Sequence, residues 1–214
     1  MDCIDRKLHN EIPRLNSMIQ DKIDNTGPGY DAILLGFGLC GKSTEKIKAG
    51  RIPVVIPKAH DCITLLLGSR EEYIKQFSAH PGTYYYSISL LDKDSEAIGQ
   101  DQFGQSADSK YDEYLKKYGA ENAKYLTGLE KEQTKNYTRL AFIHHNIAVA
   151  ESYRNKVHEI NKQFNLKYEE LLGNLALLFN LIEGYWDEKD FLVLNPDEIA
   201  VASNNDSALK KLEL

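Results

Sequence analysis

Hydrophobic positions in the first part of the chain follow two different spacings. Within residues 5–23 the apolar side chains stand three or four positions apart, which is typical of an amphipathic helix. Two short, mainly apolar segments at residues 31–35 and 52–56 have the length of buried strands. A turn rich in Gly and Pro at residues 25–29 separates the helix from the first of these strands.

The alternation of helix and strand patterns continues as far as residue 194. Helices are expected at residues 43–49, 63–78, 111–132, 147–164 and 175–184, and strands at residues 84–86, 139–143, 167–171 and 191–194. Strands that alternate with helices favour a parallel arrangement of the strands. We therefore expect an α/β fold with a mainly parallel sheet and helices on both faces, and two Rossmann-like lobes are one form of it.

A polar stretch divides this pattern into two parts. Residues 92–110 are rich in Gly, Ser, Asp and Gln, which predicts a loop or lobe boundary. We expect an N-terminal α/β lobe at 1–91 that carries all the cysteines, and a C-terminal α/β lobe at 111–201. The polar tail at 202–214 is expected to fray.

Charge and hydropathy exclude several classes of function. A net charge of −6 offers no basic excess for nucleic-acid phosphates or for an anionic membrane surface. No apolar run approaches the roughly 18 residues of a membrane-spanning helix, and the N-terminus has no apolar core of a secretory signal. Three cysteines form an odd set, which favours reduced thiols over disulfides. We expect a cytoplasmic protein that binds neither nucleic acid nor membrane.

The three cysteines occupy similar places relative to the expected strands. Cys40 and Cys62 each follow shortly after a buried apolar run, and Cys3 stands where an initial strand would end. In open α/β sheets functional groups gather at the carboxyl ends of the strands. We therefore predict that the three sulfur atoms converge on one metal ion or cluster. The alternative for each cysteine is a small buried apolar side chain.

The residues around the cysteines indicate which cofactor would suit them. Soft thiolates select zinc, copper(I) or an iron–sulfur cluster. His60, close to Cys62 in the sequence, is the candidate fourth ligand, while Gly38 and Gly41 flank Cys40 and would let the backbone approach a cofactor closely. Three thiolates with an open fourth position suit catalytic zinc or a cluster with an accessible iron, and both stay open.

A second motif overlaps the first cysteine loop. Residues 36–43 match the phosphate-loop pattern GxxxxGK[ST], in which Lys42 would reach phosphates and Ser43 would bind magnesium. The stretch before the next strand is short for the helix that such a loop requires, and no acidic residue ends that strand. Nucleotide binding is therefore a less favoured alternative.

Several segments together resemble one protein family. Residues 30–41, 52–69, 80–85 and 184–194 are similar to those of the uncharacterised DUF1638 proteins, most specifically at Gly-Leu-Cys-Gly and His-Asp-Cys. Family members tend to carry a cysteine near the N-terminus, which Cys3 matches. They occur in anaerobic archaea and bacteria, often in gene neighbourhoods with corrinoid-dependent methyltransferases. The resemblance thus implies a role beside methyl transfer or metallocofactor handling, with a corrinoid protein or methyltransferase as partner.

These observations give one main hypothesis and two alternatives. The main hypothesis is a cytoplasmic protein that holds zinc or an iron–sulfur cluster through Cys3, Cys40 and Cys62, with His60 as the possible fourth ligand. The first alternative is a non-catalytic metal carrier or methyltransferase adaptor. The second is a nucleotide-binding protein that uses residues 36–43. The sequence assigns no catalytic residue.

Overall fold

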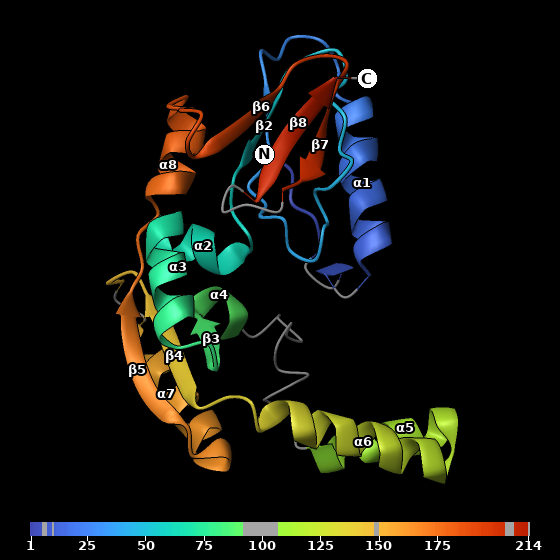
Figure 1. Cartoon of the computed structure of the whole chain (residues 1–214), viewed down its shortest axis with the longest axis vertical. Coiled ribbons are helices and arrows are strands. Elements are labelled where there is room, and N and C mark those ends of the chain that lie inside the picture. The colour runs from blue at the N-terminus through green and yellow to red at the C-terminus, as the bar shows by residue number, and fades with distance from the viewer. Residues whose placement is uncertain (6–7, 10, 92–106, 148–149, 204–207, 214) are drawn as a thin grey trace. The chain divides into compact units, whose positions relative to one another are not determined.

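The computed structural model describes residues 1–5, 8–9, 11–91, 107–147, 150–203 and 208–213 (Figure 1). The helices are α1 (Ile12–Asp24), α2 (Cys62–Leu67), α3 (Arg70–Ala79), α4 (Ile88–Leu91), α5 (Ala107–Tyr118), α6 (Ala120–Thr134), α7 (Ala150–Phe164) and α8 (Ala176–Glu183). The strands are β1 (Ile33–Leu34), β2 (Val54–Pro57), β3 (Thr83–Ser87), β4 (Arg139–His144), β5 (Lys167–Leu172), β6 (Phe191–Leu194), β7 (Glu198–Ala202) and β8 (Leu209–Glu213).

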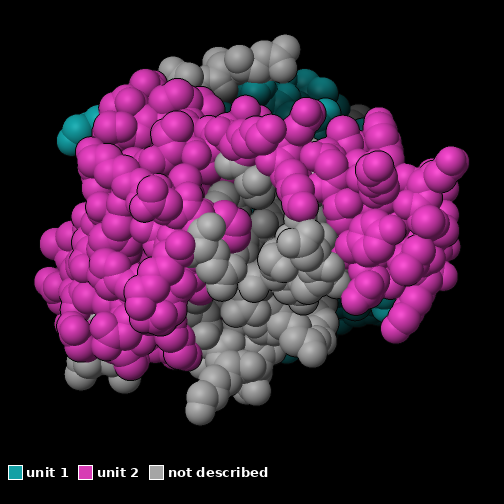
Figure 2. All heavy atoms as spheres, turned by 90° about the horizontal axis from the view of Figure 1, so that it is seen from below, with its two compact units in different colours: residues 1–76, 173–214 teal, residues 77–172 magenta. Residues whose placement is uncertain are grey.

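The chain forms two compact units, which Figure 2 colours separately. Unit 1 consists of residues 1–76 together with 173–214, and unit 2 of residues 77–172. Unit 2 is thus inserted into unit 1, an arrangement that differs from the consecutive lobes expected at 1–91 and 111–201. Of the loop expected at 92–110, residues 92–106 lie outside the described part of the chain.

Parallel and antiparallel strand pairs both occur. In unit 1, β2 pairs in parallel with β1 and antiparallel with β6, while β7 and β8 form an antiparallel pair. In unit 2, β3, β4 and β5 form a parallel sheet. A mixed α/β fold with parallel strands is therefore confirmed. The finer expectation, Rossmann-like lobes with helices on both faces of a mainly parallel sheet, is not confirmed.

The core of unit 1 forms around β2. Val54, Val55 and Ile56 have no exposed surface, and because side chains alternate along a strand they enter two apolar clusters. Val54 and Ile56 belong to the cluster that contains Leu15 and other residues of α1. Val55 belongs to the cluster that contains Leu177 and other residues of α8. Burial of an unbroken apolar run therefore explains why 54–57 is a central strand.

The C-terminal segment completes unit 1 rather than fraying. Leu194 of β6 pairs with Val54, and Ile199 of β7 forms a bridge with Lys48. Ala208 and Leu209, within the tail expected to fray, have no exposed surface. Within the expected tail, residues 209–213 are therefore a strand, because β8 buries its first residue and pairs along β7.

Unit 2 contains the parallel sheet and a helical hairpin. Leu140 and Phe142 of β4 are fully buried and pack with Tyr86 of β3 and Val157 of α7. Arg139 is also buried, and its Nε atom lies 2.7 Å from Glu169. The helices α5 and α6 lie side by side in Figure 1.

Three expected helices differ from those observed because of single glycine or proline positions. The helix expected at 63–78 is divided at Gly68, and that expected at 111–132 is divided at Gly119, where φ is +74° and +79° respectively. The first helix begins at Ile12, with Pro13 in its first turn; residues 6, 7 and 10 of the expected helix lie outside the described residues. Likewise, residues 148 and 149 precede α7 and are not described.

No helix in the described part of the chain is both long enough and apolar enough to cross a membrane.

Replacement of Gly68 should destabilise unit 1 more than replacement of Gly184. A Cβ atom at Gly68 would lie 2.2 Å from the carbonyl oxygen of Asn174, whereas one at Gly184 would meet nothing within 4 Å. Both glycines have positive φ, for which an alanine costs about 1–2 kcal/mol. We expect Gly184→Ala to lose about that amount and Gly68→Ala about 3 kcal/mol or more, since overpacking is added. Urea denaturation measures both, and equal losses would contradict the proposed clash.

Candidate functional site

The segments that follow β1 and β2 stay together after the strands end. The N–H groups of Leu35, Leu39 and Cys40 donate to the carbonyl oxygens of Val55, Ala59 and His60, at 2.9, 2.8 and 2.9 Å. These hydrogen bonds hold the cysteine loop beside the segment that leads into α2. Cys40 and Cys62 therefore lie on neighbouring segments, each a few residues beyond the end of its strand.

Gly38 lets these two segments approach closely. A Cβ atom at this position would lie 2.8 Å from both the Cα and the carbonyl carbon of Asp61, a distance that real Cβ atoms do not adopt. Gly41 has a positive φ of +63° and lies against the side chain of Ile12. Both glycines thus serve the packing of the chain on itself, and their expected contact with a cofactor stays a prediction.

The thiols of Cys40 and Cys62 shift each other's pKa in opposite directions. The hydrogen bond from the Cys62 thiol is the main cause that lowers the pKa of Cys40, and it outweighs burial. The backbone N–H groups of Cys62 and Gly38 also stabilise the Cys40 thiolate. The same hydrogen bond, followed by desolvation of the sulfur atom, raises the pKa of Cys62 well above its ordinary value, although the residue as a whole is exposed. The pair therefore loses its first proton more easily than a lone thiol and holds its second more strongly.

Asp61 fixes the position of Cys62. Its Oδ1 atom accepts hydrogen bonds from the backbone N–H and the hydroxyl of Thr64, at 3.0 and 3.3 Å. Asp61 is thus the N-cap of α2. The negative charge of Asp61 makes a smaller contribution that raises the pKa values of both Cys40 and Cys62.

His9 is a neighbour of this site that the sequence did not indicate. Burial lowers the pKa of His9, and the nearby carboxylate of Asp61 acts in the opposite direction. His9 precedes α1, whose first residue, Ile12, lies against Gly41. A single histidine before a helix carries no periodic or motif signal, so only the packing of α1 reveals this proximity.

His60 makes a ring contact instead of joining a group of ligands. Its imidazole stacks on the ring of Tyr73 in α3, with 6.0 Å between the ring centroids. Within the described ranges, no group of three or more His, Cys, Asp and Glu side chains is arranged to hold a metal ion. The role of His60 as a ligand stays a prediction.

Cys3 is not placed with the other two cysteines. Residues 1–5 form no strand, so the strand end that motivated its inclusion does not exist. Asp2 pairs with Lys22 at 2.8 Å in the last turn of α1, whereas Gly41 lies against Ile12 in the first turn. The rise of the helix between these turns is about 15 Å. The structure therefore brings Cys40 and Cys62 together and leaves Cys3, which is exposed, elsewhere.

The residues that match the phosphate-loop pattern form a turn. No helix begins at Lys42, and the helix expected at 43–49 is absent from this described stretch. Ser43 is fully buried, and its hydroxyl donates to the carbonyl oxygen of Leu39 at 3.2 Å. Lys42 is exposed and lies 3.7 Å from Glu45. The groups that would bind phosphate and magnesium are thus engaged within the turn.

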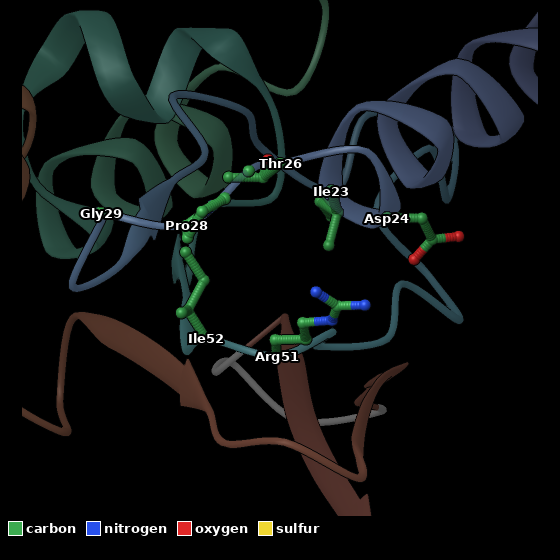
Figure 3. A pocket seen from close by; sticks show the side chains of 8 residues that line it. Ile23, Asp24, Thr26, Pro28, Gly29, Arg51 and Ile52 are labelled. Atoms are coloured by element: carbon green, nitrogen blue, oxygen red, sulfur yellow. The ribbon is translucent and has the colours of Figure 1, made fainter.

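A pocket of about 280 Å³ lies beside the last turn of α1 (Figure 3). It is lined by Ile23, Asp24, Thr26, Gly27, Pro28, Gly29, Arg51 and Ile52. None of the residues predicted to bind a metal or cofactor lines this pocket. Gly41 lies against Ile12 in the first turn of α1, so the cysteine pair is near the opposite end of that helix. The pocket is therefore separate from the thiol site.

Loss of the thiol donor should change the pH dependence of Cys40 alkylation. Because the thiolate is the reactive form, a lowered pKa keeps Cys40 reactive as pH falls below the range of an ordinary thiol. Cys62→Ala removes the donor, so the loss of reactivity should occur at higher pH, and Cys62→Ser should give a smaller shift. Peptide-resolved iodoacetamide labelling measures this midpoint. An unchanged midpoint in Cys62→Ala would refute the hydrogen bond.

Gly38→Ala should separate the two thiols, and Gly36→Ala should not. A Cβ atom at Gly36 meets nothing within 4 Å, which makes this glycine a matched control in the same loop. In Gly38→Ala the midpoint of Cys40 alkylation should move upward as in Cys62→Ala, because the same donor is lost. Equal midpoints in the two glycine variants would show that the close approach to Asp61 does not position Cys40.

Comparison with known proteins supports the resemblance noted in the sequence. Neither the curated proteins nor the solved structures include a match. The model of the DUF1638 family, described as a protein of unknown function, matches residues 3–182. The match includes all three cysteines and ends within α8, so residues 184–194 lie beyond it. Since the matched region is most of the 214-residue sequence, the chain belongs to the DUF1638 family.

Proposed function

We propose that the chain binds one thiophilic metal ion through the thiolates of Cys40 and Cys62 and acts as a metal carrier. The observation that carries this proposal is the backbone pairing of the two segments, which places Cys40 beside the residues that directly precede Cys62. Two thiolates form a soft donor set, which favours copper(I) or zinc over magnesium or calcium. Cys62 is exposed, so a metal donor can reach the pair from solvent.

The number of thiols supports a carrier more than a closed site. Structural zinc is held by four protein ligands, and iron–sulfur clusters are generally held by four thiolates. In the ranges that the structure describes, only Cys40 and Cys62 come together, and the Asp61 carboxylate is engaged in capping α2. A cluster, or a closed zinc site, would thus need ligands from a second molecule. Open coordination positions are what an acceptor needs in order to take the metal.

The protein groups around Cys40 would make metal binding easier near neutral pH. A metal can bind only when the thiols lose their protons. The hydrogen bonds to the Cys40 sulfur favour its thiolate, and Asp61 holds Cys62 at the start of α2. A bound metal would take the place of the proton that the two sulfur atoms share.

The resemblance to the DUF1638 family supplies a setting for this proposal. It implies metallocofactor handling beside corrinoid-dependent methyl transfer, and a corrinoid protein or methyltransferase is therefore the proposed acceptor. Reduced thiols, which the proposal requires, are consistent with a cytoplasmic location.

Metal titration of the reduced, metal-free protein tests the proposal. Under anaerobic conditions we expect one zinc or copper(I) ion per chain, measured by competition with a chromophoric chelator. Cys40→Ser and Cys62→Ser should each weaken binding by at least about 100-fold, since each removes a ligand rather than its support.

Cys3→Ser is the matched control and should bind as the unaltered chain does. An equal loss of affinity in Cys3→Ser would instead favour the three-cysteine site. Absence of binding of zinc, copper(I) and iron to the unaltered chain would refute the proposal.

A further inference from the structure

We propose that Cys40 and Cys62 also form a reversible intramolecular disulfide by exchange with low-molecular-weight disulfides. This activity needs no metal and does not depend on the proposed metal site. It gives the thiol pair a second chemistry, in which the protein accepts or donates two electrons.

The backbone arrangement suits a disulfide between these two residues. Cys40 N–H donates to His60 at 2.9 Å, and Leu39 N–H donates to Ala59 at 2.8 Å, so the two segments run at strand spacing. Adjacent strands lie about 4.8 Å apart, and these hydrogen bonds place Cys40 beside His60 and Asp61, so Cys62 is the next residue along the neighbouring segment. Disulfides bridge Cα separations of roughly 4.4–6.8 Å. The effect of each thiol on the pKa of the other is consistent with this proximity. Bond formation therefore joins two side chains that lie on neighbouring, hydrogen-bonded segments.

The two cysteines lie in different local structures. Cys62 is the first residue of α2, and Asp61 caps that helix. Cys40 lies in a turn, where it and Lys42 have positive φ values of 35° and 75°. Both cysteines have exposed surface, so a small disulfide can reach the pair.

The exchange proceeds in two balanced steps. One protein thiolate attacks a sulfur atom of the small disulfide, a protein–sulfur bond forms, the small S–S bond breaks and one small thiolate leaves. The second protein thiolate then attacks the protein sulfur of this mixed disulfide and expels the other small thiol. The protein thiols are oxidised by two electrons, the small disulfide is reduced to two thiols, and the two protein protons end on those thiols. A reducing dithiol reverses both steps.

The disulfide would also regulate the proposed metal site. It consumes both thiolates, so oxidation and metal binding exclude each other. This consequence rests on the proposed function, whereas the disulfide itself does not.

Intact mass spectrometry of the metal-free protein tests the inference. The reduced protein is treated with oxidised glutathione in the presence of a chelator, then alkylated and digested for peptide mapping. We expect a peptide pair linked through Cys40 and Cys62, with Cys3 as the cysteine left to react with glutathione or the alkylating reagent. Dithiothreitol should restore three alkylatable cysteines.

Variants separate the steps of the exchange. Cys40→Ser and Cys62→Ser should each retain a glutathione adduct on the remaining cysteine of the pair, while Cys3→Ser should form the disulfide as the unaltered chain does. Gly38→Ala should form it more slowly than Gly36→Ala. Circular dichroism verifies that each variant is folded.

Two outcomes would overturn the inference. One is a stable glutathione adduct on Cys40 or Cys62 of the unaltered chain, without a link between them. The other is that Cys40 and Cys62 both remain fully alkylatable although Cys3 has already reacted with glutathione. If either occurs while the chain still binds one metal, only the disulfide fails. A disulfide in a chain that binds no metal would instead remove the metal proposal alone.

Discussion

The antiparallel pairing of β2 with β6 is the interaction on which unit 1 depends. β2 is buried on both faces, and its parallel neighbour β1 has only two residues, so the other edge of β2 needs a partner. β6 supplies that partner, although in the sequence it comes after the whole of the inserted unit. The entropy lost in closing such a long connection grows only with the logarithm of its length, so the insertion is tolerated. The cysteine pair lies just beyond the end of this anchored strand.

The sequence predicted individual helices and strands better than it predicted which strands pair with one another. The apolar run at 191–194 coincides with β6, and the run at 52–56 overlaps β2, because continuous burial leaves a continuous apolar signal. The choice of the strand that pairs with β2 leaves no such local signal. The sequence therefore predicts two consecutive lobes and not an inserted unit. The strand β8 was missed because four of its five residues are exposed and two of them are lysines.

The sequence predicted those parts of the candidate site that nearby strands position. It did not predict the parts that depend on how distant segments pack. Cys40 and Cys62 follow their strands within a few residues, and backbone hydrogen bonds between the two connecting segments fix their positions. The inclusion of Cys3 required a strand that residues 1–5 do not form. The proximity of His9 arises from the way α1 packs, and the phosphate-loop pattern matched residues whose hydrogen bonds maintain a turn. A motif alone therefore could not distinguish a ligand loop from a tight connection.

The insertion of unit 2 also has a consequence for protein synthesis. Because the chain emerges from the ribosome in order, residues 77–172 are complete before β6 leaves the exit tunnel. Until then β2 has one bare edge, and the face of Val55 lacks the side chains of α8 that later cover it. The nascent chain thus carries an aggregation-prone strand and two reactive thiols for the whole time that the inserted unit is being made. A pause in translation after unit 2 would prolong this exposure, so a chaperone would engage β2 and the face of Val55 until residues 173–214 have emerged.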